Sequence, residues 1–295
     1  MKKILALMLA LSLVTVLAGC GKETVTEADT TPDTAVETPE AEPVAEETST
    51  EIEGTVTISG STSVEKVGLG LGEEFMALNP SVTVTYESIG SSGGVKNAHD
   101  GVTMIGTASR EIKDTEKEWG MTEATIAFDG IAVAVNPANG VTEITKDQVA
   151  AIYKGEITNW SEVGGADADI VVVSREDGSG TRGAFEEILD FEGGLTVNAL
   201  IAEGNGNVQT TVASNPQAIG YISFSTINDT IIALKVDGAE ATMENVLNQS
   251  FPISRPFNIV YHETNLSDAA KAFIEFIFTA EGQTVVEEKG GIPVK

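Results

Sequence analysis

A stretch in the middle of the chain combines the residue types that bind an oxyanion. Residues 170–173 form a short β-branched run typical of a buried strand. The chain then turns through the small residues 177–180 and becomes helical from Thr181. Such a turn presents free N–H groups at the positive end of a helix dipole, while Arg175 and Ser179 add further donors. An ordinary strand–helix loop with a hydroxyl cap would have the same pattern, so this stretch alone leaves both interpretations open.

Three earlier loops repeat this design. Each follows a predicted strand, is rich in small hydroxyl residues and precedes a predicted helix: residues 60–63, residues 89–95 and residues 108–110. Ligands of open α/β sheets bind at the carboxyl ends of strands, which is where these loops fall. Four loops of one design are better explained by a shared oxyanion site than by four unrelated helix caps.

The charge balance limits the classes of ligand. The 295 residues include 45 acidic and 17 basic side chains, for a formal charge of −28. No basic face is available to neutralise nucleic acid, and electrostatic binding to anionic lipid is equally disfavoured. An anion would have to be held by local donors against an unfavourable long-range field.

The first twenty residues predict export. Lys2 and Lys3 precede an apolar run over residues 4–17, and small residues lead to Cys20, the single cysteine of the chain. This pattern is typical of a secretory signal and too short for a comfortable membrane span. The ending L-A-G-C resembles the bacterial lipoprotein signal, which implies cleavage before Cys20 and lipid attachment to its sulfur. The alternative is an ordinary signal cut near Ala18.

Residues 21–54 predict a disordered tether. The segment holds eleven acidic residues and one base, Lys22, and few large apolar side chains. It cannot bury enough apolar surface to fold, and its charges repel one another.

The alternation of strands and helices from Thr55 onward predicts an α/β fold with mostly parallel strands. The long apolar run over residues 126–135 and the proline-flanked segment near Pro252 suggest two crossings between lobes. We therefore expect lobe I to comprise residues 55–132 and 253–295, and lobe II residues 133–252.

Taken together, these motifs resemble the phosphate-binding protein of bacterial phosphate ABC transporters, over most of the chain from Thr55 on. The resemblance implies a two-lobed type II periplasmic-binding-protein fold, with mixed sheets flanked by helices and a phosphate cleft between the lobes. It also implies an extracytoplasmic, lipid-anchored monomer that delivers inorganic phosphate to a membrane permease, with no cofactor, metal or enzymatic activity. The matching motifs are G-S-T-S-V from Gly60, I-G-S-S-G-G-V from Ile89, I-G-T-A-S-R-E from Ile105, F-D-G from Phe128 and S-R-E-D-G-S-G-T from Ser174.

The resemblance also implies a ligand shell. The N–H of Ser63 and of Gly180 would contact phosphate beside the hydroxyls, and Arg175 would make the charge-assisted contact. Asp177 would orient Arg175 and partly neutralise it, with Ser92 and Arg110 in support. The implied phosphate-binding residues are Thr62, Ser63, Ser91, Ser109, Arg175, Ser179, Gly180 and Thr181.

One position departs from the commonest family pattern. Many members place an aspartate where this chain has Ser109, although one branch has Ser-Arg there. The aspartate accepts the proton that phosphate still carries, and it thereby rejects sulfate. Serine can accept or donate, so we expect a weaker filter against sulfate or another acceptor, for which Glu111 and Asp129 are candidates.

Three alternative functions remain open. A serine hydrolase would need a base, but His99 and His262 are the only histidines, and there is no G-x-S-x-G elbow. A binding protein for another oxyanion, such as sulfate, molybdate or arsenate, fits Ser109. A surface adhesin or sensor would use the same fold and tether.

Overall fold

A computed structural model of the protein describes residues 51–294. The predicted signal, the lipid site Cys20 and most of the predicted tether lie outside these residues. Gly54, the expected last residue of the tether, instead begins the first strand. Within the described part, no helix is long and apolar enough to cross a membrane.

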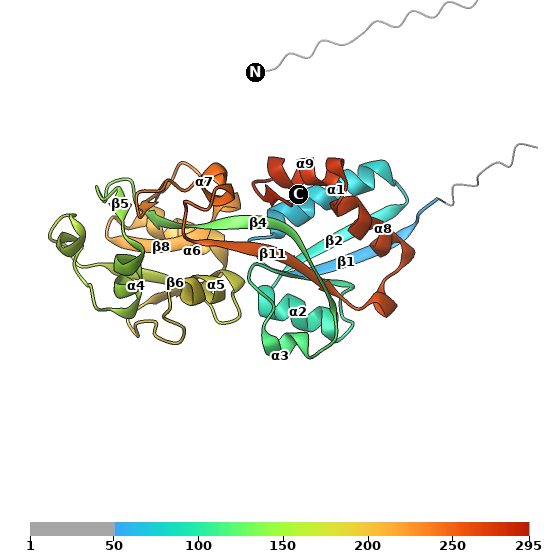
Figure 1. The fold of residues 1–295 in the computed structure, drawn as a ribbon, viewed down its shortest axis with the longest axis horizontal. Helices are drawn as coiled ribbons and strands as arrows, with labels where there is room; N and C mark the ends of the chain where they lie inside the picture. Colours follow the sequence, from blue (N-terminus) through green and yellow to red (C-terminus); the bar gives the residue numbers. More distant parts are fainter. Residues whose placement is uncertain (1–50, 295) are drawn as a thin grey trace, which may run out of the picture. The chain divides into compact units, whose positions relative to one another are not determined.

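Strands and helices alternate as expected, and Figure 1 shows them in two groups joined by long strands. The strands are β1 (Gly54–Gly60), β2 (Val82–Ser88), β3 (Ile105–Ala108), β4 (Thr122–Val135), β5 (Glu143–Ile144), β6 (Val171–Arg175), β7 (Leu200–Ala202), β8 (Ala218–Ser223), β9 (Ile232–Ala233), β10 (Lys235–Val236), β11 (Ser254–Tyr261) and β12 (Ile292–Pro293). The α-helices are α1 (Glu65–Leu78), α2 (Ser91–His99), α3 (Asp114–Lys117), α4 (Lys146–Lys154), α5 (Gly180–Ile188), α6 (Gly204–Ser214), α7 (Met243–Leu247), α8 (Asp268–Ile277) and α9 (Ala280–Glu288).

The main sheet is parallel at both ends and antiparallel in the middle. Its order is β2-β1-β3-β11-β4-β8-β6-β7. β1 runs parallel to β2 and β3, and β6 runs parallel to β7 and β8. Between these parallel groups, β11 and β4 pair antiparallel over most of their length, with Arg255 opposite Asp129. The sheet is therefore mixed, as the resemblance implied, and not mostly parallel, as the alternation of elements predicted, because the two long central strands run in opposite directions.

Separate apolar cores support the two groups of elements. One cluster packs α1, α8 and α9 on β1 and β11, with the Phe75 ring 5.3 Å from the ring of Phe273. A second cluster packs α4 and α5 on the other half of the sheet, where Phe185 stacks on Tyr221 at 4.0 Å. A third, smaller cluster lies under α6. Each group of elements thus buries its own apolar surface, which defines a two-lobed α/β fold.

A glycine explains how the second hydroxyl loop is placed. A side chain at Gly94 of α2 would overlap the Cα of Gly60 and the carbonyl oxygen of Ser59 on β1. Because there is no Cβ, the first turn of α2 lies directly against the carboxyl end of β1. The G-S-S-G-G motif therefore brings its serines beside the first loop.

Candidate functional site

The four hydroxyl loops meet at one place. Ser63, which follows β1, shares a hydrogen bond of 2.9 Å between its Oγ and Oγ1 of Thr181. The N–H of Ser92 donates to the carbonyl of Gly178 at 3.1 Å. The N–H of Ser109 donates to Oγ of Ser91 at 3.1 Å. The convergence predicted from four similar loops is present, since loops of both lobes contact one another.

Gly180 lies at the tightest point of this junction. A Cβ at this position would overlap Oγ of Ser91 and lie 2.8 Å from Oγ of Ser109. Beside it, Ser179 caps α5, because its Oγ accepts from the N–H of Arg182 at 3.3 Å. Gly180 and Thr181 are the first residues of α5, so their N–H groups lie at this junction. The first N–H groups of a helix have no partner within the helix and can therefore donate to a ligand.

Arg175 is buried at the end of β6, with 1% of its surface exposed. Its Nε and Nη2 donate to the two carboxylate oxygens of Glu176 at 2.8 and 2.7 Å. Nη2 also reaches Oγ1 of Thr62 at 3.1 Å, and Nη1 reaches Oγ1 of Thr181 at 3.4 Å and Oδ1 of Asn205 at 3.3 Å. The guanidinium therefore joins loops of both lobes, and its bond to Thr181 is the longest.

The prediction that Asp177 orients Arg175 is wrong. Asp177 points to solvent and pairs with Arg182 at 2.7 Å, while Glu176 takes the bidentate position on Arg175. Burial raises the pKa of Glu176, but the hydrogen bonds and charge of Arg175 outweigh it and hold the pKa below its ordinary value. Glu176 is therefore the ionised group that orients Arg175.

Arg110 and Ser92 brace the site from outside. The Arg110 guanidinium binds both oxygens of Glu116 at 2.8 Å and donates to Oγ of Ser92 at 3.2 Å. Burial raises the pKa of Glu116, but bonding to Arg110 brings it below its ordinary value. The Arg110 guanidinium is thus occupied by the ion pair with Glu116, and this pair holds the loop that carries Ser109 in place.

Sequence reasoning missed two site residues and left the place of a third open. Asn205, 2% exposed in the first turn of α6, bonds both Thr62 and Ser63. Arg255 on β11 donates to Oγ of Ser63 and to the carbonyl of Ser109, each at 3.0 Å. Its partner Asp129 is fully buried, and burial raises the pKa of this carboxyl despite the guanidinium beside it. G-N-G at residues 204–206 follows a short strand, a signal that could have revealed Asn205.

All four arginines of the sequence lie around this junction, and each has its own carboxylate. The pairs, with their N–O distances, are Arg110–Glu116 at 2.8 Å, Arg175–Glu176 at 2.7 Å, Arg182–Asp177 at 2.7 Å and Arg255–Asp129 at 2.9 Å. The charges are compensated locally, so an anion here would rely on oriented N–H and O–H dipoles.

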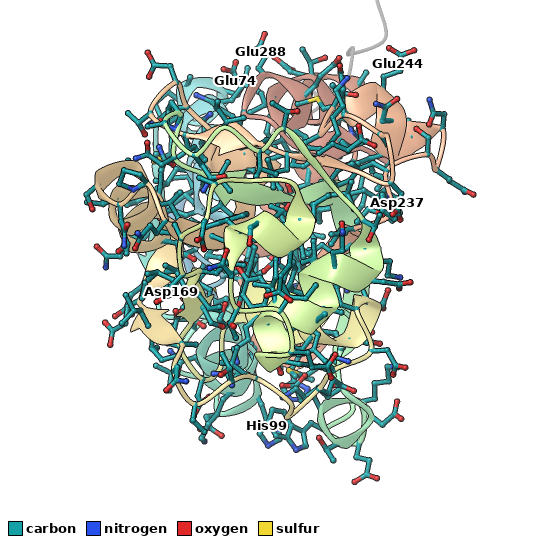
Figure 2. The ribbon with its side chains drawn as sticks, turned by 90° about the vertical axis from the view of Figure 1, so that its left-hand side faces the viewer. Glu74, His99, Asp169, Asp237, Glu244 and Glu288 are labelled. Carbon is teal, nitrogen blue, oxygen red and sulfur yellow. The ribbon has the colours of Figure 1, made fainter. Side chains whose placement is uncertain are left out.

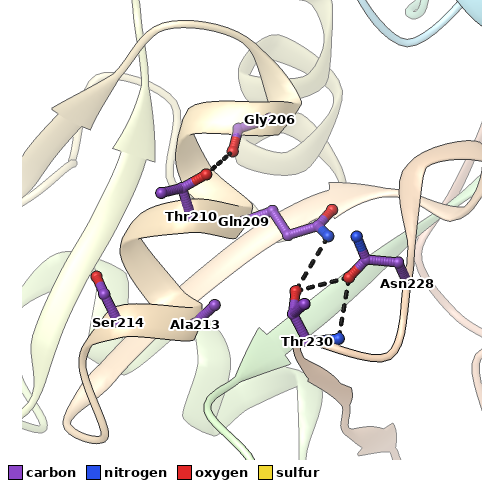
Figure 3. Close-up of a pocket in the computed structure, with 7 residues that line it drawn as sticks. All are labelled: Gly206, Gln209, Thr210, Ala213, Ser214, Asn228 and Thr230. Atoms are coloured by element: carbon purple, nitrogen blue, oxygen red, sulfur yellow. Dashed lines mark hydrogen bonds between the residues drawn. The ribbon is translucent and has the colours of Figure 1, made fainter. Parts of the chain in front are cut away.

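The remaining polar features lie away from these contacts. His99 stacks on Trp119 with ring centroids 4.5 Å apart, lies 5.8 Å from His262, and is at the lower edge of Figure 2. A groove beside α6 is lined by Gln209, Asn228 and Thr230, among others, and none of the predicted ligand residues lines it (Figure 3). Within residues 51–294, no three His, Cys, Asp or Glu side chains are grouped to hold a metal.

Two lobes whose loops enclose a set of oriented donors define a solute-binding protein. The model of a family described as the PBP superfamily domain matches residues 45–281. The phosphate-binding protein PstS of Bacillus subtilis is 32% identical over 245 residues, which cover 82% of this chain and 81% of that protein. The chain therefore belongs to the PBP superfamily, in the family of PstS phosphate-binding proteins.

Solved structures agree with this membership. A protein from Clostridium perfringens, assigned as a phosphate ABC transporter substrate-binding protein and solved with bound phosphate, has a TM-score of 0.81 and 52% identity. The match covers 82% of this chain and all of that one. An ABC-type phosphate transport receptor from Vibrio cholerae has a TM-score of 0.69 and 35% identity, over 81% of this chain and all of that one.

Proposed function

We propose that this protein captures inorganic phosphate between its lobes and delivers it to a membrane ABC permease. The observation that carries the proposal is the junction of four loops, where the buried Arg175 contacts the half-buried hydroxyl of Thr62 and the buried hydroxyl of Thr181. The relatives named above bind or transport phosphate, and these loops carry the motifs shared with their family.

The proposed ligand shell follows the geometry of the loops. Thr62 and Thr181 would donate their hydroxyls, and Gly180 its N–H, to the phosphate oxygens. Ser91 and Ser109 would face the same anion from the other loops, and Ser179 would set the start of α5. Arg175 would contribute through its charge and through Nη1, whose 3.4 Å bond to Thr181 is the one that an incoming anion would replace.

Ser63 has a different place from the one expected. Its N–H donates to Oγ of Ser61 at 3.1 Å, and its hydroxyl bonds Thr181, Asn205 and Arg255. We therefore propose that Ser63 orients Thr181 rather than contacting phosphate through its N–H.

The proposed hinge consists of β4 and β11. These two paired strands run from one apolar cluster to the other (Figure 1). Residues 55–132 and 253–295 would form lobe I and residues 133–252 lobe II, with β12 returning to pair with β4. The α5 loop lies against Ser91 and Ser109 in this structure, and opening about this pair of strands would separate them.

The cellular setting is the finer part of the proposal. The lipoprotein-like ending at Cys20 supports an extracytoplasmic protein that is anchored to the membrane by a lipid on that sulfur. The acidic tether would hold a monomeric binding domain clear of the membrane, where it could reach its permease. A transport role needs no catalytic base, and neither His99 nor His262 is hydrogen-bonded to a site hydroxyl within residues 51–294.

Isothermal titration with phosphate, sulfate and arsenate tests the proposal. We expect phosphate to bind more tightly than sulfate, and Arg175→Ala to weaken phosphate binding by about 2–5 kcal/mol, because a buried charged contact is lost. Lys154→Ala, which removes an exposed cation paired with Glu156, is the matched control and should leave affinity unchanged. Sulfate binding as tight as phosphate binding would favour the other-oxyanion alternative, and unchanged affinity in Arg175→Ala would remove Arg175 from the site.

A further inference from the structure

Asn205 uses every hydrogen-bonding position of its amide. Its Nδ2 donates to Oγ1 of Thr62 at 3.3 Å and to Oγ of Ser63 at 3.0 Å. Its Oδ1 accepts from Nη1 of Arg175 at 3.3 Å and from the N–H of Ser223 at 3.2 Å. The reversed amide would place N–H groups against two other donors, so only this orientation satisfies all the partners.

This amide decides the direction of the Ser63 hydroxyl. Oγ of Ser63 accepts from Asn205 and, at 3.0 Å, from Nη2 of Arg255. A hydroxyl has two lone pairs and one hydrogen. With both lone pairs occupied, the hydrogen of Ser63 must point at Oγ1 of Thr181, 2.9 Å away. Thr181 then accepts from Ser63, and its own hydrogen is left to donate.

Thr62 is fixed in the same way. Its Oγ1 accepts from Nη2 of Arg175 at 3.1 Å and from Nδ2 of Asn205 at 3.3 Å. Both lone pairs are used, so this hydroxyl can only donate. Neither Thr62 nor Ser63 depends on the long bond between Arg175 and Thr181 for its direction.

The opposite loops are not fixed. Within the described residues, Oγ of Ser109 accepts one hydrogen bond, from Oγ of Ser61 at 2.8 Å. Oγ of Ser91 likewise accepts one, from the N–H of Ser109 at 3.1 Å. Each retains a lone pair and a hydrogen, so each can accept or donate.

We propose that Asn205 is a positioning residue that makes one side of the phosphate site donor-only, and that the proton of bound hydrogen phosphate is accepted on the other side, by Ser91 or Ser109. The inference rests on the proposed function. On this inference, the protein discriminates between protonation states of phosphate because Thr62 and Thr181 can only donate, whereas Ser91 and Ser109 can donate or accept. A carboxylate at position 109 is not needed, because a hydroxyl with a free lone pair can accept one P–OH.

The test is the pH profile of phosphate affinity, measured by titration calorimetry on the whole protein. Asn205→Ala frees a lone pair on Thr62, and one on Ser63 that lets Thr181 donate to Ser63 and accept from phosphate. The more protonated anion then gains partners, and the profile should move to lower pH. The double variant Ser91→Ala/Ser109→Ala removes both candidate acceptors, so the profile should move to higher pH. Each variant should also lose roughly tenfold in affinity for the loss of hydrogen bonds.

The opposite directions separate positioning from a merely structural effect. Thr62→Val removes a donor without freeing an acceptor, so it should weaken binding with no displacement of the profile. Profiles that move together, or that stay in place in both variants, would overturn the inference while leaving phosphate binding intact. Failure of the unmodified protein to bind phosphate would instead overturn the proposed function. If Asn205→Ala does not fold, the direction of the shift in the Ser91→Ala/Ser109→Ala variant decides.

Discussion

The arginine–carboxylate pairs at this site bear on how a strongly acidic chain could bind an anion. The chain carries a formal charge of −28, yet it is proposed to bind an anion. The four arginines do not form an open positive patch, because each is neutralised by a carboxylate at 2.9 Å or less. What remains for a ligand is a set of hydroxyl and amide dipoles held in direction by those ion pairs. Oriented dipoles in a buried site stabilise an anion without reorganisation.

The Arg110–Glu116 pair gives a prediction for acid stability. The pKa of Glu116 is held below its ordinary value of 4.5. A carboxyl whose pKa is lowered by folding stabilises the protein above its unfolded pKa, and this contribution is lost as the pH falls through the folded pKa. Glu116→Gln should therefore lower the free energy of unfolding by about 1–3 kcal/mol at neutral pH, since a buried charged hydrogen bond is lost.

Urea unfolding of this variant and the unmodified protein between neutral pH and pH below 4.5 checks the prediction. The difference in the free energy of unfolding between the two proteins should become smaller as the pH falls. Glu118→Gln changes an exposed carboxyl beside the same helix and should follow the unmodified protein at every pH. A constant difference in unfolding free energy across this pH range would show that Arg110 does not lower the pKa of Glu116.

The sequence predicted local chemistry better than long-range partners. Ser91, Ser109 and Thr181 were predicted to lie close together because each belongs to a recognisable loop between a strand and a helix, and they do lie at one junction. The choice between Glu176 and Asp177 could not be made, because adjacent residues in a turn point in different directions. Arg255 could not be placed either, since its contact with Ser63 depends on how β11 pairs with β4.

At the scale of elements, the site depends on close approach between α5 and the loops that precede α2 and follow β3. Gly180 permits that approach, and its backbone is helical, so alanine would add bulk without backbone strain. Gly180→Ala should weaken phosphate binding by about 1–3 kcal/mol, because the methyl group would have to displace Ser91 and Ser109. Titration calorimetry with phosphate measures the loss.

Gly206→Ala is the control for this change. Gly206 is also helical, on α6, and a Cβ there would meet nothing within 4 Å. This variant should bind phosphate as the unmodified protein does. Equal affinity in both variants would mean that the contact between the α5 loop and Ser91 is not part of the bound state.

The elements themselves were mostly predictable. The apolar run over residues 126–135 became β4, which starts earlier, at Thr122. The Gly- and Asn-rich composition of residues 198–208 favours irregular structure, but α6 begins at Gly204. Composition disfavoured a helix there, and tertiary bonds from Asn205 to Thr62 and Ser63 compensate.

At the scale of the whole described domain, unpaired acidic side chains and the ion-paired arginines occupy different places. Glu244, Asp237 and Glu288 lie toward the edge of the view in Figure 2, while the ion pairs of Arg175 and Arg255 lie at the junction of the lobes. The ion pairs leave the junction locally neutral within a strongly acidic protein. We therefore expect the ligand to bind where both lobes contribute donors.

The location of a bound anion is the most direct test of this arrangement. Arsenate is tetrahedral like phosphate, and arsenic scatters X-rays anomalously, so crystals grown with arsenate would reveal its position. We predict one strong anomalous peak within hydrogen-bonding distance of Thr62, Gly180 and Thr181, with Ser91 or Ser109 on its other side. A peak elsewhere, such as the groove beside α6 in Figure 3, or no peak at the junction of the four loops would contradict the account.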